Sequence, residues 1–410
     1  MLTVVLILDH ASVTGGLAKV ALDSAVGLKR AGQRPIIFAA AAPLDPRLAA
    51  EKIETVCLGQ PDLLGNPSKL AAAAQGIWNV TAAARLRGLL AALPRNGTII
   101  HVHGWAKALS PSITAPIRRS RLPAVYTMHD YFLFCPNGGF YNYPAQRICK
   151  LKPLSGACWK SNCDSRSYIR KLWRGLRALI VKYTVRMPDV FSDIVLLNNF
   201  QTRIVRDYLP RKARIHYLSN PIDSERLGPK SAPADGDFLF VGRLSPEKGT
   251  LCFAEAARKA GIKPVFAGNG PMAERLAAEY PEAVLLGWKT PQEVRALMRA
   301  ARAVIFPSQW YEGQPLTVLE ALSLGTPVIV SDACAGRASV EHNVNGLWFA
   351  SQNADALAAA IKLMQNDDAA ARLSRAAYDR FWENPPTLDP HTTQLVRIYD
   401  DILAPSRVAA

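Results

Sequence analysis

The chain has 410 residues, of which 49% are hydrophobic, and this is enough to build the cores of two or three domains. A disordered tail and a small disulfide-dependent scaffold are thereby excluded. No apolar run approaches the roughly 18 uncharged residues that a membrane-spanning helix needs, and the apolar residues 2–8 lack the basic start of a secretory signal. We therefore expect a cytoplasmic protein.

The formal net charge is +16, from 49 Lys and Arg against 33 Asp and Glu. The excess is confined to the first half, since residues 1–222 hold 30 basic and 11 acidic residues and residues 223–410 hold 19 and 22. A generally solubilising surface is one explanation. The uneven distribution favours another, in which the first half docks on an anionic partner. We expect no nucleic-acid partner.

Short apolar runs alternate with stretches of helical period along the chain. In the first half the predicted strands are residues 4–8, 35–39, 98–102, 124–128, 193–197 and 214–218. In the second half they begin near Phe238, Pro264, Ala283, Ala303, Pro327 and Leu347. Such alternation is typical of parallel sheets covered on both faces, so we expect an α/β fold with two doubly wound domains.

The domain boundary is predicted within residues 219–236, where Pro, Gly, Ser and Asp interrupt the pattern. The end after Ala404 is expected to fray. Open α/β sheets bind ligands beyond the carboxyl ends of their strands, so functional residues should lie in the turns that follow the strands.

Two turns of the first half carry candidate binding residues. Gly15 and Gly16 follow the first strand and open a helix, where backbone N–H groups can approach a phosphate. His101 and His103 end the third strand and His129 follows the fourth. We select His129 for substrate contact, whereas His103 is equally well explained as a structural residue.

Four of the seven cysteines crowd into residues 135–163, namely Cys135, Cys149, Cys158 and Cys163. Their gaps do not match a usual zinc ribbon, but a four-thiolate site needs only convergence in space. A structural zinc ion on these four residues is therefore one hypothesis. Thiols without a metal are the other.

Residues 165–187 predict a basic amphipathic helix. Its apolar stripe consists of Ile169, Leu172, Trp173, Leu176, Leu179, Ile180 and Tyr183, and Arg and Lys occupy much of the remaining circumference. Such a helix is typical of a segment that meets an anionic membrane surface or cradles a phosphorylated acceptor. A helix that packs its stripe on the first domain explains the pattern equally well.

In the second half, Arg243 and Lys248 lie on the loop after the strand that begins near Phe238. Two cations at the carboxyl end of a strand can neutralise a diphosphate, although a solvated surface loop is the alternative. Residues 268–273 formally match a dinucleotide fingerprint around Gly270. Pro271 and the late position of this motif leave a nicotinamide oxidoreductase as a minor alternative.

The strand of residues 303–306 leads to a turn in which Pro315 suits the first position of a helix. The N–H groups of this helix start would face an anion. Its residues are Gly313, Gln314, Pro315 and Leu316. Glu312 and Glu320 lie on either side and could hold hydroxyls at opposite ends of one elongated ligand, unless they are unrelated surface residues.

Together these motifs resemble the retaining GT-B glycosyltransferases, specifically glycosyltransferase family 4. The resemblance rests on Gly15-Gly16, the Thr-Met-His-Asp sequence that ends at Asp130, Gly242-Arg243, Lys248-Gly249, residues 268–271, and Glu312 with Glu320. Residues 130–139 and the basic stretch after them look like a subgroup associated with bacterial surface polysaccharide.

The resemblance implies two Rossmann-like domains that face a central cleft. Residues 1–220 would form the acceptor-side domain, on which a C-terminal helix of about residues 390–402 packs back, and residues 221–389 would form the donor domain. It also implies that Arg243 and Lys248 bind the donor diphosphate, which Gly15 and Gly16 approach.

By the same resemblance, Glu320 would bind the ribose hydroxyls and Glu312 the transferred sugar. His129 would contact the sugar near the reacting carbon, and Gly270 would lie near the base. His129, Glu312, Arg243 and Lys248 are therefore the expected catalytic residues.

The function implied is transfer of a sugar, with retention of configuration, from a UDP- or GDP-linked donor to a lipid-linked or polysaccharide acceptor. The product would be a cell-surface glycan such as lipopolysaccharide. No metal cofactor is expected to be required, and the enzyme would be peripheral on the inner face of the cytoplasmic membrane. The alternative is a catalytically silent GT-B-like docking protein that binds anionic lipid or polymer.

Overall fold

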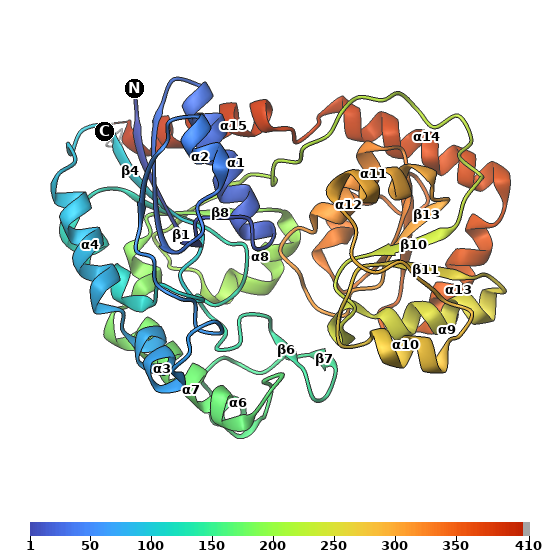
Figure 1. The fold of residues 1–410 in the computed structure, drawn as a ribbon, viewed down its shortest axis with the longest axis horizontal. Coiled ribbons are helices and arrows are strands. Elements are labelled where there is room, and N and C mark those ends of the chain that lie inside the picture. Colours follow the sequence, from blue (N-terminus) through green and yellow to red (C-terminus); the bar gives the residue numbers. More distant parts are fainter. Residues whose placement is uncertain (405–410) are drawn as a thin grey trace. The chain divides into compact units, whose positions relative to one another are not determined.

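The computed structural model describes residues 1–404, and the expectation for the residues after Ala404 lies outside that range. The chain forms two compact α/β units (Figure 1). Unit 1 comprises Met1–Gly138, Leu151–Pro221 and the C-terminal segment from Pro386. Unit 2 comprises Gly139–Lys150 and Ile222–Pro385.

Unit 1 contains a seven-stranded parallel sheet of order β3-β2-β1-β4-β5-β8-β9. The strands are β1 (Thr3–His10), β2 (Arg34–Ala41), β3 (Glu54–Cys57), β4 (Thr98–Val102), β5 (Ala124–Thr127), β8 (Asp193–Leu196) and β9 (Arg214–Tyr217). The six strands predicted in the first half are confirmed. The edge strand β3 was not predicted, because it has only four residues and is only partly buried.

Nine α-helices surround this sheet within the described part of unit 1. They are α1 (Gly16–Arg30), α2 (Pro46–Ala50), α3 (Lys69–Ile77), α4 (Val80–Ala91), α5 (Thr114–Ser120), α6 (Gly156–Lys160), α7 (Tyr168–Leu179), α8 (Asn199–Val205) and α15 (Leu388–Leu403). The last helix packs on α1 and shares a core with β1. A Cβ at Gly27 of α1 would lie 2.1 Å from Thr392 Oγ1, so glycine permits this close crossing.

Unit 2 contains a six-stranded parallel sheet of order β12-β11-β10-β13-β14-β15. The strands are β10 (Phe238–Val241), β11 (Pro264–Ala267), β12 (Val284–Leu285), β13 (Ala303–Phe306), β14 (Val328–Ser331) and β15 (Gly346–Phe349). The six strands predicted in the second half are thereby confirmed.

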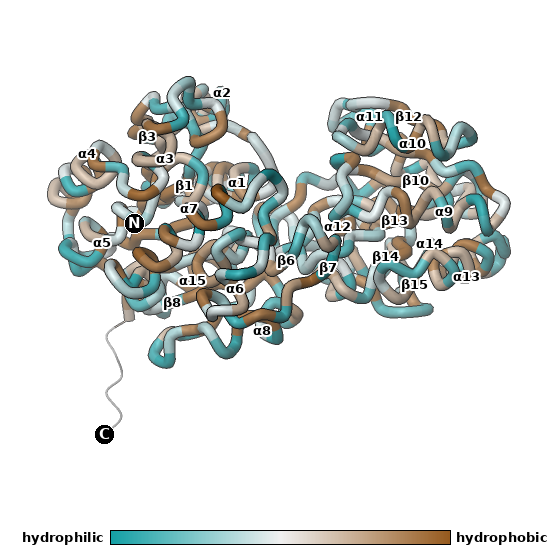
Figure 2. Tube along the Cα trace, turned by 90° about the horizontal axis from the view of Figure 1, so that it is seen from below, coloured by the Kyte–Doolittle hydropathy of each residue, from teal (hydrophilic) through white to brown (hydrophobic). Residues whose placement is uncertain are grey.

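Both faces of this second sheet are covered, as the runs of buried residues in the strands require. Phe238 and Phe240 of β10 pack with α9 (Thr250–Ala260) and α13 (Ala354–Met364), and Leu239 packs on the opposite face. The remaining helices are α10 (Ala273–Glu279), α11 (Pro291–Ala300), α12 (Leu316–Ser323) and α14 (Asp367–Glu383). Figure 2 shows hydrophobic and hydrophilic stretches alternating along the chain in both units.

A short antiparallel hairpin of β6 (Tyr141–Asn142) and β7 (Arg147–Ile148) belongs to unit 2, although the chain on both sides of it belongs to unit 1. The sequence did not predict this hairpin and assigned its residues to the first domain. Within the described residues, no helix combines the length and the apolar character needed to cross a membrane.

The loops at the carboxyl ends of β10, β11 and β13 stack directly on one another in unit 2. A Cβ at Gly249 would lie 2.1 Å from the carbonyl oxygen of Pro307, and one at Gly270 would lie 2.2 Å from that of Leu244. Gly249 also has a φ of +71°, which L side chains rarely adopt. These glycines therefore allow three functional loops to share one edge of the sheet.

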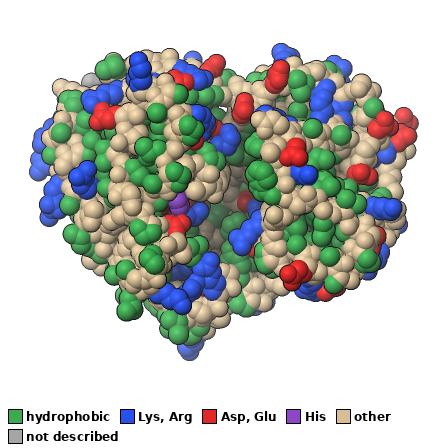
Figure 3. Space-filling view, viewed as in Figure 1, with side chains coloured by type: hydrophobic (Ala, Val, Ile, Leu, Met, Phe, Trp, Pro, Cys, Tyr) green, Lys and Arg blue, Asp and Glu red, His purple; other side chains and the backbone are tan. Residues whose placement is uncertain are grey.

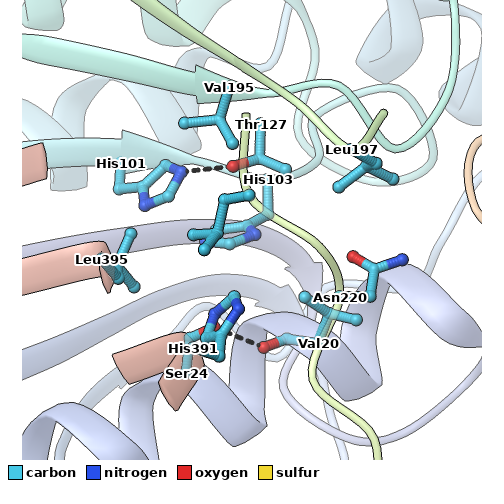
Figure 4. A pocket seen from close by; sticks show the side chains of 11 residues that line it. Val20, Ser24, His101, His103, Thr127, Val195, Leu197, Asn220, His391 and Leu395 are labelled. Atoms are coloured by element: carbon cyan, nitrogen blue, oxygen red, sulfur yellow. Dashed lines mark hydrogen bonds between the residues drawn. The ribbon is translucent and has the colours of Figure 1, made fainter. Parts of the chain in front are cut away.

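Buried histidines connect α15 to the sheet of unit 1. His101 Nδ1 lies 2.6 Å from the hydroxyl of Tyr399, and His391 Nδ1 donates to the carbonyl oxygen of Ser219 at 2.8 Å. Figure 4 shows His101, His103 and His391 around a pocket of about 10 Å³, which has room for about one water molecule. Burial lowers the pKa of His101 to about 3 and that of His391 to about 4.

The stacked loops lead to a stability prediction. Gly249→Ala should lower the free energy of unfolding by about 2 kcal/mol or more, because it combines a positive φ with a backbone clash. Gly261→Ala is the matched control, since Gly261 has a φ of +72° and nothing within 4 Å of its added Cβ. It should cost about 1 kcal/mol. Urea unfolding of both variants provides the measurement, and equal losses would contradict the close approach.

The histidines lead to a prediction about pH. The unfolded chain takes up protons near pH 6.5, whereas folded His101 and His391 remain neutral until about pH 3 and 4. The free energy of unfolding should therefore be greatest above pH 6.5 and fall as the pH drops toward about 4. His391→Gln should lower the proton uptake on unfolding at about pH 5 by about one proton.

Urea unfolding of the wild type and His391→Gln at a series of pH values would measure that uptake. Asp130 contributes with the opposite sign, because its pKa is raised to about 6 in the folded state, but both proteins retain it. The same pH dependence in both proteins would refute a neutral buried His391.

Candidate active site

An ion pair between two loops forms the centre of the candidate site in unit 2. Lys248 Nζ donates to Glu312 Oε1 at 2.6 Å, and the hydroxyl of Ser308 donates to the same oxygen at 2.8 Å. The side chains of Lys248 and Glu312 are 22% and 11% exposed, so both are largely buried but still reach solvent. The structure thus brings together a predicted cation and a predicted carboxylate that are 64 positions apart in the sequence.

The surroundings of the pair are aromatic and constrained. Lys248 Nζ lies 5.6 Å from the centroid of Phe306 and 5.7 Å from that of Trp310. Glu312 adopts a φ of +54°, which costs a non-glycine residue about 1 kcal/mol. The strained backbone directs this carboxylate at Lys248. The charge of Glu312 and, above all, burial raise the pKa of Cys334 to about 12.

Two buried polar groups next to the pair have no hydrogen-bond partner among residues 1–404. They are the indole nitrogen of Trp310 and the hydroxyl of Thr250, the first residue of α9. Buried polar groups are nearly always satisfied in folded proteins. Trp310 and Thr250 each stand two residues from a member of the ion pair in the sequence, Glu312 and Lys248 respectively.

Arg243 lies on the same loop as Lys248, and its side chain is exposed. The loop is held by Leu244, whose N–H donates to Asn269 at 2.9 Å and whose carbonyl accepts from Met272 at 3.0 Å. Gly270 packs directly against the backbone of Leu244, where a Cβ would clash with the Leu244 carbonyl oxygen. The predicted residues Arg243, Lys248 and Gly270 thus occupy one stacked assembly of loops.

Helix α12 begins at Leu316, one residue later than predicted, with Pro315 at the N-cap. Gly313, Gln314 and Pro315 form the turn before it, so the N–H groups of the first helical turn point out of this end of the helix. Glu320 on α12 borders a pocket of about 220 Å³ that Arg295 and Arg299 of α11 also line.

The hairpin of unit 2 supports the loop that carries Glu312. Tyr141 is fully buried, and its hydroxyl donates to Gln309 Oε1 at 3.3 Å. Gln352 Nε2 donates to the same oxygen at 3.1 Å, and Gln309 N–H donates to the carbonyl of Glu247 at 2.8 Å. Gly139 leaves room for Trp310, whose ring would lie 3.0 Å from an added Cβ. The hairpin therefore helps to position the Glu312 loop.

Ser308, Gln309 and the hairpin were not predicted from the sequence as parts of the site. Ser308 and Gln309 stand within the loop that was singled out for Glu312, so their position in that turn was the available signal. For the hairpin, the signal was the turn residue Pro144 between two short segments, Tyr141-Asn142 and Arg147-Ile148.

In unit 1, Gly15 is the N-cap of α1, and an added Cβ there would meet nothing within 4 Å. The space beside this helix start is thus open. Gly16 is the first residue of the helix. The two glycines occupy the turn where backbone N–H groups can meet an anion.

His129 is partly buried at the carboxyl end of β5, and its Nε2 lies 3.0 Å from Nδ1 of the buried His103. Burial lowers the pKa of His129 to about 3, so the ring is neutral at pH 7. His103 is thereby a partner that orients His129. Next to it, burial raises the pKa of Asp130 to about 6, a property that the sequence did not reveal.

The described structure does not show a metal site on Cys135, Cys149, Cys158 and Cys163. Among residues 1–404, no group of three or more His, Cys, Asp or Glu side chains is placed to hold a metal ion. Cys149 lies in the hairpin segment of unit 2, whereas the other three belong to unit 1. The four cysteines are thus divided between the two units.

Comparison with known families matches both parts of the chain. Residues 15–221 match the model of the glycosyl transferase 4-like domain, and residues 223–380 match that of the glycosyl transferases group 1.

Two curated relatives illustrate the similarity. A UDP-Gal:alpha-D-GlcNAc-diphosphoundecaprenol alpha-1,3-galactosyltransferase of Escherichia coli is 26% identical over 245 residues, which cover 53% of this chain and 60% of the relative. A GDP-mannose-dependent alpha-mannosyltransferase of Corynebacterium glutamicum is 28% identical over 173 residues, covering 41% of this chain and 40% of the relative. The match thus spans less than two thirds of either relative.

Solved structures share the fold over 98% of the chain. Anabaena HepE in complex with UDP and glucose has a TM-score of 0.67 at 15% identity and covers 98% of this chain and 100% of that one. Sucrose-phosphate synthase from Thermosynechococcus elongatus has a TM-score of 0.71 at 17% identity, with the same coverage of 98% and 100%. The chain therefore belongs to the GT-B glycosyltransferases, with a glycosyl transferase 4-like domain followed by a glycosyl transferases group 1 domain.

Proposed function

We propose that the protein transfers a sugar from a UDP- or GDP-linked donor to a lipid-linked or polysaccharide acceptor in cell-surface glycan synthesis, with retention of the anomeric configuration. The observation that carries the proposal is the Lys248–Glu312 pair at the shared edge of three stacked loops. A cation and a hydroxyl-binding carboxylate held side by side suit the two parts of a sugar diphosphate, namely the phosphate and the sugar.

In the proposed mechanism, the bond between the anomeric carbon and the diphosphate breaks, and negative charge develops on the leaving phosphate. Lys248, Arg243 and the N-terminal turn of α12 stabilise that charge by electrostatic interaction. These groups are the reason for proposing that no metal cofactor is required. Glu312 binds hydroxyls of the transferred sugar, Glu320 those of the ribose, and Gly270 lies near the base.

The acceptor oxygen attacks from the face that the diphosphate leaves, and the leaving phosphate accepts the acceptor's proton. No strong general base is then needed. His129 is suited to hydrogen bonding with the sugar because its ring is neutral at pH 7. Gly15 and Gly16 approach the phosphates through the open turn before α1.

The names of the relatives support the donor and acceptor classes. The Escherichia coli relative is named for UDP-Gal and a diphosphoundecaprenol-linked acceptor, and the Corynebacterium glutamicum relative for GDP-mannose. A polyprenol-linked acceptor is held by a membrane, so we place this enzyme as a peripheral protein on the inner face of the cytoplasmic membrane.

Variants of the ion pair should separate donor binding from transfer. Lys248→Ala should weaken UDP or GDP binding about tenfold or more, because a charge-assisted contact to the diphosphate is lost. Glu312→Gln should bind the nucleotide at least as tightly as the wild type, because Lys248 no longer has an anionic partner. It should nevertheless lose about a hundredfold or more of the transfer rate.

Calorimetric titration with UDP and GDP, preceded by a thermal-shift screen of nucleotide sugars, would measure these effects. Lys263→Ala is the matched control, because Lys263 is exposed at the amino end of β11, away from the stacked loops. Binding of neither nucleotide by the wild type would favour the silent docking protein instead.

Glu320→Ala should weaken UDP binding but leave pyrophosphate binding unchanged, because Glu320 is assigned to the ribose rather than to the phosphates. Lys248→Ala should weaken both ligands. Competition titrations with UDP and inorganic pyrophosphate distinguish these results. Equal losses of both ligands in Glu320→Ala would remove the ribose assignment.

A further inference from the structure

Helix α7 is oriented with its apolar side toward solvent. Ile169, Leu172 and Leu176 are 79%, 38% and 50% exposed. Their spacing of three and four residues places them on one face of the helix, which we call the apolar face. Of the two explanations that the sequence left open, packing of the apolar stripe on the first domain does not hold for these three residues, although Trp173 does pack inward.

The opposite side of α7 is buried and carries charge. Lys171 is 1% exposed, donates to the carbonyl oxygen of Cys158, and lies 4.9 Å from the centroid of the Trp159 ring. Gly175 faces the same ring, because an added Cβ would lie 2.5 Å from it. This side of the helix therefore docks on a neighbouring segment through a buried cation.

A second buried cation fixes the orientation of the helix. Arg177 is 3% exposed, donates to the carbonyl oxygen of Ala106 at 2.7 Å, and lies within 5.5 Å of the ring centroids of Trp105, Phe132 and Trp173. Three aromatic faces and a carbonyl compensate for the lost hydration of the guanidinium. A rotation of the helix that turned its apolar face inward would remove Arg177 from these rings and this carbonyl. The apolar face is therefore a fixed feature of the surface.

Positive charge surrounds the apolar face. Residues 151–188 contain nine Lys and Arg and a single acidic residue, Asp164. Of these cations, Lys171 and Arg177 are buried, as described above, and do not contribute to the surface. The side chain of Asp164 is 0% exposed and pairs with Arg174 at 3.2 Å. Arg166 and Arg170 at the start of α7 are exposed. Figure 3 shows Lys and Arg side chains gathered at the end of unit 1 that α6 and α7 occupy, with hydrophobic side chains among them.

We propose that the apolar face of α7 inserts into the headgroup region of an anionic bilayer, while Arg166, Arg170 and neighbouring lysines contact the lipid phosphates. Hydrophobic residues rimmed by cations match the two layers of such a surface. Tyr183, 62% exposed after the helix, adds an aromatic residue of the type enriched at membrane interfaces. The purpose of this docking, access to a lipid-linked acceptor, rests on the proposed function.

An anionic lipid surface explains these observations better than a protein partner. A protein interface tends to be depleted of charge at its core, and a nucleic acid would leave the three aliphatic side chains without an environment. An anionic bilayer offers phosphates to the cations and an apolar layer to the three aliphatic side chains. It also accounts for the scarcity of acidic residues around the apolar face, since each would be repelled by the lipid charge.

Co-sedimentation of the full chain with vesicles tests the proposal. The wild type should bind vesicles of equal parts phosphatidylcholine and phosphatidylglycerol, bind phosphatidylcholine alone much more weakly, and lose binding as salt is raised. The combined Ile169→Gln, Leu172→Gln and Leu176→Gln variant should bind the anionic vesicles about tenfold or more weakly. Because these side chains are already exposed, the variant should fold.

Arg166→Gln combined with Arg170→Gln should weaken binding to the anionic vesicles about tenfold and flatten the salt dependence. Leu363→Gln is the matched control, because Leu363 is 43% exposed on α13 of unit 2 and should leave vesicle binding unchanged. Vesicle binding by the triple glutamine variant equal to that of the wild type would overturn the proposal. Wild-type binding that ignores lipid charge would also overturn it.

Two further measurements separate this inference from the proposed function. UDP or GDP titration of the triple glutamine variant should match the wild type, since α7 lies outside unit 2. Loss of vesicle binding with intact nucleotide binding would support membrane docking, whereas absent nucleotide binding would affect only the proposed function. A wild-type dimer in sedimentation analysis that the triple variant abolishes would instead assign the apolar face to a second copy of the chain.

Discussion

The ion pair between Lys248 and Glu312 joins the loop after β10 to the loop after β13. Each loop follows a different strand of a parallel sheet, so the pair depends on the register of the whole sheet. Backbone contacts at Gly249 and Gly270 bring the loops close enough for it. The hairpin of β6 and β7 contacts the loop after β13 through the hydrogen bond from Tyr141 to Gln309. The geometry of the candidate site is therefore a property of the packed sheet.

Local sequence pattern was sufficient to predict much of this arrangement. Strands buried on both faces appear as continuous apolar runs, and twelve were predicted on that basis. Lys248 and Glu312 were selected because they follow strands, and the carboxyl ends of parallel strands meet at one edge. Strand β3 was missed because its residues are half-buried and lack such a run. The hairpin was missed because its strands have only two residues each.

The orientation of α7 shows a different limit of sequence reasoning. Helical spacing reveals that an apolar side exists, but it does not reveal what that side faces. The orientation is decided by Trp105 and Phe132, which lie far from α7 in the sequence and provide the environment for Arg177. A buried guanidinium is improbable on composition alone. Only the tertiary structure shows that its burial is compensated, and that Ile169 is consequently left in solvent.

The hairpin also determines how the molecule can be divided. The backbone passes between the two units at residues 138/139, 150/151, 221/222 and 385/386. A single cut therefore cannot release either unit whole. A fragment that starts at Ile222 would lack Tyr141 and leave Gln309 without that hydroxyl, so the loop that carries Glu312 would be less ordered than in the intact chain. Dissection of the protein into halves, or exchange of second halves between relatives, must carry residues 139–150 along with the second half.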